Sequence, residues 1–176
     1  MKDKTLADTR RTAGKGGRFI PALCNLFGTL ILLLVIASCL PMTVPRLMGY
    51  EIYEVVSGSM EPEIPVGSVV YVKETKPEDI QEGDVIAFWS GDSVITHRVT
   101  RNKLVEGEFA TKGDANAAED IRTVAYSELI GRVTYHFPVI GELMRLYTSN
   151  IGKIYVIAFA ACGAMLNMLA SRLRDR

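Results

Sequence analysis

Two long apolar segments, one near each end of the chain, constrain the fold more than any other feature of this sequence. No charged residue occurs from Phe19 to Val44, and a second apolar segment extends from about Ile154 to Ala170. A helix needs about 20 apolar residues, each rising about 1.5 Å, to cross a hydrocarbon core about 30 Å thick. The first segment is long enough and the second is near the lower limit. We therefore expect two transmembrane helices on either side of a polar middle.

Basic residues flank both apolar segments on the sides that lead to the chain ends. Those before the first are Lys2, Lys4, Arg10, Arg11, Lys15 and Arg18, and those after the second are Arg172, Arg174 and Arg176. Positively charged flanks stay in the cytoplasm. We therefore expect a cytoplasmic N-terminus (1–18), a transmembrane helix (19–44), an extracytoplasmic domain (45–150), a second transmembrane helix (151–170) and a cytoplasmic C-terminus (171–176).

The first apolar segment admits two other interpretations. A cleavable signal peptide is disfavoured, because the apolar run is longer than a usual signal-peptide core. The segment Ile36–Cys39 resembles a lipoprotein cleavage box, which would place a lipid on Cys39. The remaining cysteines, Cys24 and Cys162, also lie in the apolar segments, so we expect no disulfide framework and no cysteine-based zinc site. A retained membrane anchor is the preferred interpretation.

The polar middle has the composition of β-strands. Short runs rich in Val, Ile, Tyr and Phe occur at Tyr50–Val56, Ser68–Val72, Asp84–Trp89, Val94–Val99 and Ile130–Tyr135. Glycine and proline punctuate these runs, and no helical period stands out between them. We predict a mainly β domain, made of small antiparallel barrel-like sheets and flanked by the two transmembrane helices. The formal net charge of zero gives no basic field for nucleic acid, and a nucleic-acid-binding N-terminal arm is disfavoured.

A serine and a histidine of the polar middle are candidates for nucleophilic chemistry. Ser59 lies in the glycine- and proline-containing segment Ser57–Pro62, and a serine needs a base to remove its proton. Histidine suits that task best, and the chain has only two. His136 lies among aromatic residues near the expected membrane surface, where it reads as an interfacial packing residue. His97 lies in a strand-like run, where composition alone favours a buried structural histidine.

The segment Thr111–Arg122 is a polar loop that carries two aspartates, Asp114 and Asp120, as well as Glu119. Asp114 or Asp120 could hold the histidine tautomer and stabilise the imidazolium, as in a serine triad. Calcium is a rival, with Asp114, Asn116, Glu119 and Asp120 as oxygen ligands. The loop lacks a complete EF-hand pattern, so we expect no metal and no other cofactor. A plain solvated loop is the simplest alternative.

Four segments of the middle, taken together, resemble the type I signal peptidase family in its ER-type branch. Ser57–Pro62 is similar to the nucleophile box of that family, and Gly83–Phe88 to its structural Gly-Asp strand. His97–Val99 falls where the common bacterial branch has a Lys-Arg pair, and Lys112–Asp120 resembles the last box. The segments follow the order of the family between two membrane segments, and the resemblance covers about residues 20–170.

The resemblance implies a role for each matching residue. Ser59 is similar to the nucleophile and His97 to the general base. Asp120 matches the acid that orients the base, and Asp114 matches a second important acid. Ser57 matches an oxyanion-hole donor of the bacterial branch, and the backbone N–H of Ser59 is expected to share that task. Which of the two acids supports His97 stays open. A serine–lysine dyad with Lys73, Lys76 or Lys112 as the base is a rival assignment, disfavoured because a neutral lysine needs strong desolvation.

By the same resemblance, the chain is expected to be a membrane-bound serine endopeptidase that removes signal peptides from exported preproteins through an acyl-enzyme. Its partners would be those preproteins and the lipid bilayer, with contacts to the export machinery left open and no nucleic acid. A catalytically silent membrane adapter that binds export substrates is the alternative. A self-cleaving repressor-like serine protease is disfavoured by the two apolar segments.

Overall fold

A computed structural model describes residues 3–138 and 140–174, with side chains from residue 19 onward. The predicted membrane orientation partly depends on the basic side chains at 1–18 and on Arg176, and these lie outside the described part. The chain forms two compact units. One comprises residues 1–40 and 147–176, and the other comprises residues 41–146.

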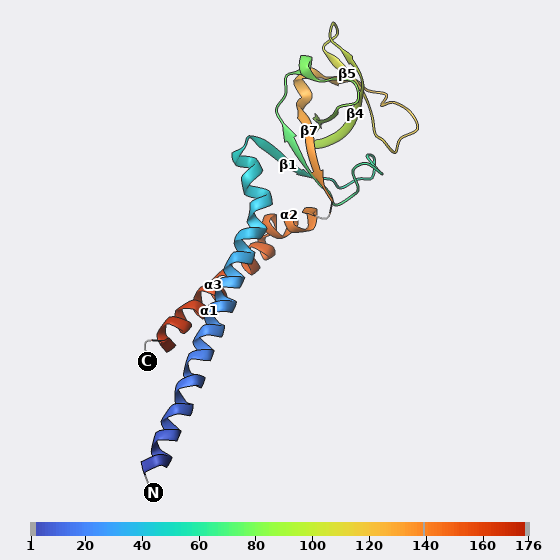
Figure 1. The fold of residues 1–176 in the computed structure, drawn as a ribbon. Coiled ribbons are helices and arrows are strands. Elements are labelled where there is room, and N and C mark those ends of the chain that lie inside the picture. The colour runs from blue at the N-terminus through green and yellow to red at the C-terminus, as the bar shows by residue number, and fades with distance from the viewer. Residues whose placement is uncertain (1–2, 139, 175–176) are drawn as a thin grey trace. The chain divides into compact units, whose positions relative to one another are not determined.

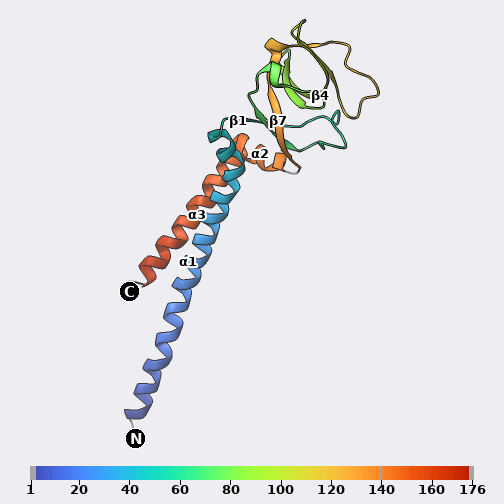
Figure 2. The ribbon, with the colours of Figure 1, turned by 45° about the horizontal axis from the view of Figure 1, so that its top comes forward.

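The first unit is built from two long helices, α1 (Asp3–Leu47) and α3 (Asn150–Arg174). Their apolar parts, Phe19–Leu47 and Asn150–Arg174, have mean hydropathies of 2.5 and 1.8. Figures 1 and 2 show α3 running alongside α1. The contact is close at Gly28, where an added Cβ would lie 2.7 Å from the carbonyl oxygen of Gly163. This confirms the expected pair of apolar helices long enough to cross a membrane.

The second unit is a single curled antiparallel sheet of seven strands in the order β1-β2-β7-β3-β4-β5-β6. Its strands are β1 (Tyr50–Glu54), β2 (Val69–Lys73), β3 (Val85–Ser90), β4 (Ser93–Lys103), β5 (Glu108–Lys112), β6 (Val124–Ala125) and β7 (Leu129–Phe137). Short 3₁₀ turns occur at Pro77–Asp79 and Tyr126–Glu128, and helix α2 (Ile140–Thr148) follows the last strand. The predicted β domain is thus confirmed.

Sequence composition missed strands β5 and β6. The segment Glu108–Lys112 begins and ends with a charged residue, so it does not read as an apolar run. Its three central residues are nevertheless buried, because β5 pairs with β4 on one side and with β6 on the other. Phe109 lies in a core cluster with Ile86, Phe88, Val99 and other apolar side chains.

Strand β1 and the first half of strand β4 each leave one edge without a neighbouring strand. Strand β1 is the first of the sheet and its ladder runs only to β2. Strand β4 pairs with β3 over Ser93–Arg98, whereas its ladder with β5 begins only at Arg98. In the ladders of the described residues, β1 and the first half of β4 therefore each keep one edge free. An extended peptide can add to such edges by main-chain hydrogen bonds.

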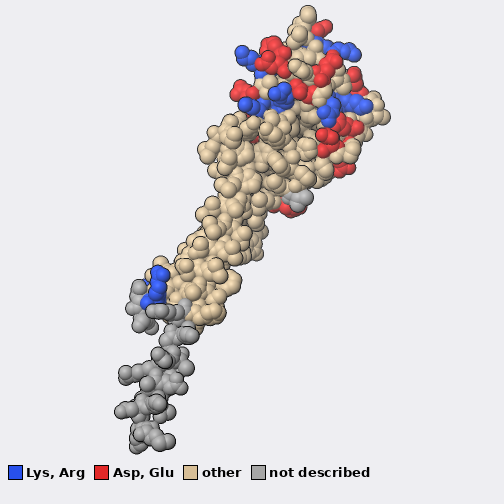
Figure 3. Space-filling view, in the orientation of Figure 1, with Lys and Arg blue, Asp and Glu red and all other residues tan. Residues whose placement is uncertain are grey.

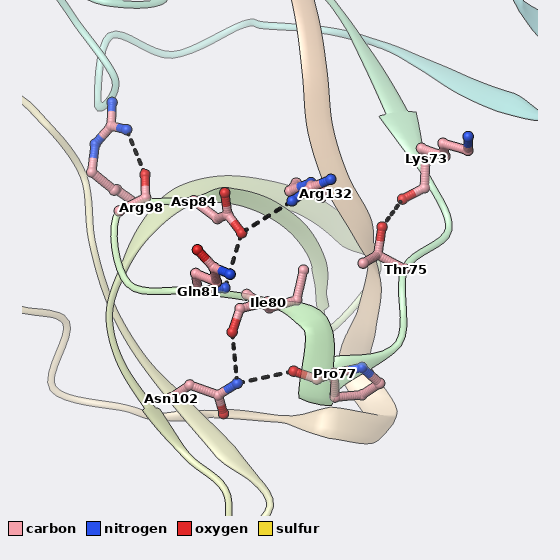
Figure 4. A network of polar contacts seen from close by, with 10 residues as sticks. Lys73, Thr75, Pro77, Ile80, Gln81, Asp84, Arg98, Asn102 and Arg132 are labelled. Carbon is pink, nitrogen blue, oxygen red and sulfur yellow. Dashed lines mark hydrogen bonds and ion pairs between the residues drawn. The ribbon is translucent and has the colours of Figure 1, made fainter.

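The loop before β3 is held by one aspartate. Asp84 accepts a hydrogen bond from the backbone N–H of Gln81 at 2.9 Å and forms an ion pair with Arg132 of β7 at 3.5 Å (Figure 4). Gly83, between them, has a φ of 93°, which a residue with a Cβ adopts only with strain. The Gly-Asp pair therefore has a structural task, which is to turn the chain into β3 and tie it to β7.

Charge is distributed unevenly. Figure 3 shows lysine, arginine, aspartate and glutamate scattered with mixed sign over the sheet unit, whereas the described parts of the long helices are almost free of charge. The charged side chains described on these helices lie near their ends: Arg46 in the last turn of α1, Lys153 in the first turn of α3, and Arg172 and Arg174 in its last turn. This pattern suits helices in hydrocarbon and a sheet in water.

The buried core of the sheet unit supplies a test of the fold. Ile86 is 0 % exposed and Ile121 is 107 % exposed, so the same substitution samples both extremes. We expect Ile86→Ala to lower the free energy of unfolding of the sheet unit by about 2–5 kcal/mol, because it removes packed methyl groups and leaves a cavity. Ile121→Ala should change it by less than about 0.5 kcal/mol. Urea titration of the detergent-solubilised chain measures both, and equal effects would contradict the described core.

Candidate active site

Ser59 lies in a compact turn between β1 and β2. The amide of Glu61 donates to the carbonyl of Gly58 at 3.1 Å, and the amide of Ile64 donates to the carbonyl of Met60 at 2.9 Å. Met60 and Ile64 are buried in a core cluster, whereas Ser59 is half-buried. The turn is therefore anchored from below by two apolar side chains and presents the serine at the surface. The hydroxyl of exposed Ser57 lies 3.5 Å from that of Ser59.

His97 lies on β4, opposite Ile86 of β3, and is 8 % exposed. Its Nδ1 lies 2.5 Å from Oδ2 of Asp120. The ring of Phe88 packs edge-on against the imidazole, with ring centroids 6.3 Å apart. Burial and the carboxylate together fix the plane of the imidazole. This contact defines the tautomer with the proton on Nδ1, which leaves the Nε2 lone pair free to accept a proton.

The second acid has a different partner. Arg98 donates to Asp114 through Nε at 2.8 Å and through NH2 at 2.6 Å, in a two-pronged ion pair. The hydrogen bonds to Asp114 raise the pKa of the Arg98 guanidinium above its ordinary value. The same guanidinium donates to the carbonyl of Gly83 at 2.8 Å (Figure 4). Of the two acids, Asp120 therefore contacts His97, and Asp114 joins its loop to β4.

Gly113 brings the nucleophile and histidine segments together. A Cβ added at Gly113 would lie 2.6 Å from the carbonyl oxygen of Ser59 and 3.0 Å from Nε2 of His97. Both groups thus occupy the side of Gly113 where a side chain would stand. The backbone N–H of Ala115 also donates to the Ser59 carbonyl at 2.9 Å. Only glycine permits this approach, so Nε2 of His97 and the backbone of Ser59 converge on one point.

A groove of about 410 Å³ opens beside Ser59 and His97. Its two walls are the end of β1 with the following residues, Tyr53–Val56, and the first half of β4, Ser93–His97. These are the two strand edges described above. Burial, helped by a hydrogen bond to Glu51 and by the charge of Glu51, raises the pKa of Tyr53 to about 12, so this wall carries an uncharged phenol. The groove can hold an extended peptide beside the serine.

The alternative interpretations invoked a metal site, a lysine base or the second histidine. The residues concerned lie in surroundings that do not match those roles. Among the described residues, no group of three or more His, Cys, Asp or Glu side chains is arranged to hold a metal ion. Nζ of Lys73 lies over the ring of Tyr50, 5.8 Å from its centroid. His136 lies on β7, opposite Val70 of β2. Neither Lys73 nor His136 lines the groove.

Sequence reasoning named Ser59, His97, Asp120, Asp114 and Ser57, but it gave no role to Arg98, Thr111 or Gly113. The structure brings Ser59, His97 and Asp120 into one site and directs Asp114 to Arg98. The signal for Gly113 is present in the sequence, since a glycine inside a polar loop often marks a close backbone approach. No comparable signal marks Thr111, because its burial depends on strand β5.

Comparison with known proteins identifies named relatives of the chain. No family model matches the chain. "Signal peptidase I W" of Bacillus subtilis is 43 % identical over 86 residues, which are 46 % of this chain and 45 % of that protein. "Signal peptidase complex catalytic subunit SEC11" of Debaryomyces hansenii is 34 % identical over 116 residues, 58 % of this chain and 69 % of the relative. The SEC11 of Clavispora lusitaniae is 30 % identical over 126 residues, 64 % and 75 % respectively.

These relatives, together with the two apolar helices, make the chain a membrane-associated peptidase. It belongs to the type I signal peptidase family, in the ER-type branch. The match spans less than half of the Bacillus protein and more than two thirds of these yeast proteins. The names support a signal peptidase function, and none of them supports a silent adapter.

The close approach at Gly113 predicts the effect of one added methyl group. Gly113→Ala should displace His97 or Ser59 and lower the rate of preprotein cleavage roughly 100-fold, because misplacing a catalytic group by about 1 Å has an effect of this size. Gly58→Ala is the matched control, since its Cβ would meet only the Glu61 side chain, at 3.4 Å. Cleavage in proteoliposomes measures the rate, and thermal unfolding checks the fold. Normal cleavage by a folded Gly113→Ala would contradict the described approach.

Proposed function

We propose that this chain is a signal peptidase I that removes N-terminal signal peptides from exported preproteins, with Ser59 as the nucleophile, His97 as the general base and Asp120 as the residue that orients the base. The observation that carries the proposal is the placement of the His97 ring. Its Nδ1 contacts Asp120 at 2.5 Å, while its Nε2 and the Ser59 carbonyl oxygen lie 3.0 Å and 2.6 Å from the position that a Cβ on Gly113 would take. One ring nitrogen is held by the Asp120 carboxylate, and the other is available to accept a proton.

The reaction follows from that arrangement. His97 takes the hydroxyl proton of Ser59 onto Nε2 while Oγ attacks the scissile carbonyl carbon. The imidazolium then gives the proton to the leaving amine, the C–N bond breaks, and the signal peptide stays bound to Ser59 as an ester. Water attacks the ester with His97 again as the base, which frees the signal peptide as a carboxylic acid. Both halves need the same nitrogen, so a fixed ring serves both.

Asp120 and two donors stabilise the charges that develop. The Asp120 carboxylate keeps the proton on Nδ1 and stabilises the imidazolium that forms in each half-reaction. The negative charge on the substrate oxygen is stabilised by the backbone N–H of Ser59 and by the Ser57 hydroxyl, whose closeness to Oγ of Ser59 supports this role. Asp114 acts indirectly, since its ion pair with Arg98 holds the loop whose Ala115 N–H bonds to Ser59.

The substrate enters as an extended strand between the free edges of β1 and β4. Main-chain hydrogen bonds to both edges align the cleavage site with Ser59, and side chains of the groove select what precedes it. The family resemblance implies small residues, commonly Ala-x-Ala, at the cleavage site, and these would bind in the groove beside Ser59. A signal peptide reaches this groove from the membrane, because its apolar helix ends at the cleavage segment.

The topology belongs to the same proposal. Both termini lie in the cytoplasm, the residues of 45–150 lie on the opposite side of the cell membrane, and α1 and α3 contain the spans. Arg172 and Arg174 in the last turn of α3 support this orientation by the positive-inside rule. The partners are the lipid bilayer and exported preproteins, with contacts to the export machinery where the preprotein emerges.

Removing the nucleophile or the base should abolish cleavage. We expect Ser59→Ala and His97→Ala each to eliminate processing of a preprotein in proteoliposomes while each variant still unfolds cooperatively; His97→Ala should also lower the unfolding midpoint, because His97 is buried. The chain has only one other histidine, so His136→Ala is the matched control and should cleave normally. Lys73→Ala, Lys76→Ala and Lys112→Ala should also cleave normally, which tests each lysine of the serine–lysine alternative. Near-normal cleavage by His97→Ala would overturn the histidine assignment.

The two acids should give different defects. Asp120→Asn is expected to lower kcat at least tenfold with little change in KM, because the imidazolium loses its counter-charge. Asp114→Asn should mainly lower the unfolding midpoint, because it leaves the Arg98 guanidinium without its partner. Steady-state kinetics and thermal unfolding of both variants separate the two roles. A kcat defect confined to Asp114→Asn would reverse the assignment.

A further inference from the structure

Thr111 is a fully buried threonine, the last residue but one of strand β5. It is 0 % exposed and lies opposite Val99 of β4. Its hydroxyl donates a hydrogen bond to Oδ2 of Asp120 at 2.7 Å. Its carbonyl oxygen accepts a hydrogen bond from the backbone N–H of Asp120 at 2.9 Å. Two bonds from one residue of a regular strand therefore hold both the backbone and the carboxylate of Asp120.

The oxygen atom that receives the Thr111 hydroxyl is the one that faces the histidine. Oδ2 of Asp120 lies 2.5 Å from Nδ1 of His97 and 2.7 Å from Oγ1 of Thr111. An ionised carboxylate oxygen accepts two hydrogen bonds along its two lone pairs. The hydroxyl thus determines which lone pair is left for the imidazole and, with it, the rotation of the carboxylate.

The loop that carries Asp120 does not provide this positioning by itself. Residues 115–119 are exposed, and so is Ile121, which follows Asp120. Within the described residues, the hydrogen bonds recorded for the Asp120 carboxylate go to His97 and Thr111. A carboxylate on an exposed loop samples several rotamers unless a rigid element holds it. The buried strand β5 supplies that element.

We propose that Thr111 is a positioning residue of this peptidase, which holds the Asp120 carboxylate so that Oδ2 meets Nδ1 of His97. The proposal rests on the function proposed above. In this proposal the hydroxyl, and not the bulk of the side chain, holds the carboxylate. Strand β5 alone would not hold it. The backbone bond holds the loop in any variant, whereas the hydroxyl acts only on the carboxylate.

Two substitutions separate the hydroxyl from the bulk of the side chain. Thr111→Val keeps the shape and removes the donor, and we expect kcat for preprotein cleavage to fall about tenfold with KM within twofold of the wild type. Thr111→Ser keeps the donor and should restore kcat to within threefold. The matched control is Thr100→Val, since the Thr100 hydroxyl donates to the carbonyl of Ala110 and not to the site. It should leave both constants unchanged.

A spectroscopic measurement tests the geometry without relying on turnover. Because the chain has two histidines, selective ¹⁵N labelling of histidine gives two imidazole spectra, and His136→Gln assigns them. We expect the His97 Nδ1 proton to resonate far downfield in the wild type and in Thr111→Ser. In Thr111→Val this signal should move upfield or broaden, because the carboxylate is no longer held against the ring. The fold of each variant is checked by its thermal unfolding midpoint.

The outcomes distinguish this proposal from the proposed function. An unchanged Nδ1 proton signal together with normal kcat in Thr111→Val would overturn the role of Thr111. A Thr111→Ser variant as slow as Thr111→Val would also overturn it, since bulk would then matter and not the hydroxyl. If Ser59→Ala still cleaved preproteins, the proposed function would fail, while the Nδ1 signal of the Thr111 variants would still report on the Asp120 contact.

Discussion

The contact between Nδ1 of His97 and Oδ2 of Asp120 is the interaction on which the rest of the site depends. It joins a residue of β4 to a loop residue that follows β5, so it forms only when these two strands pair in their observed register. A shift of one residue along β4 would turn His97 to the other face of the sheet. The core around Ile86, Phe88, Val99 and Phe109 opposes such a shift. The strand pairing that stabilises the sheet is therefore also the pairing that brings His97 and Asp120 together.

The same sheet creates the place where a peptide can bind. Strand β4 is longer than β5, so its first half projects beyond the ladder and leaves an edge free. Strand β1 supplies the facing edge and leads directly into the turn that carries Ser59. Exposed edges usually endanger a soluble protein because they recruit other strands. In the proposed function, the same tendency lets the two edges recognise an extended substrate.

The loop from Gly113 to Asp120 divides two carboxylates between two tasks. Asp114 and Asp120 are similar in type and lie six positions apart, so local sequence does not rank them as partners of His97. In the fold, the arginine next to His97 alternates to the other side of β4 and takes Asp114, while the histidine takes Asp120. Gly113 and Thr111 make this division possible, the first by having no side chain and the second by its buried hydroxyl.

Hydropathy and strand composition are enough to predict the pair of apolar helices and the β character of the middle, because both patterns act locally, whereas Ser59 and His97 were named through a family resemblance. The tertiary structure alone decided which acid meets His97, how β5 buries Thr111, and how closely Gly113 approaches Ser59. Each of these depends on contacts between segments far apart in the chain. Strand register and chain packing set such contacts, and neither is encoded in any single segment.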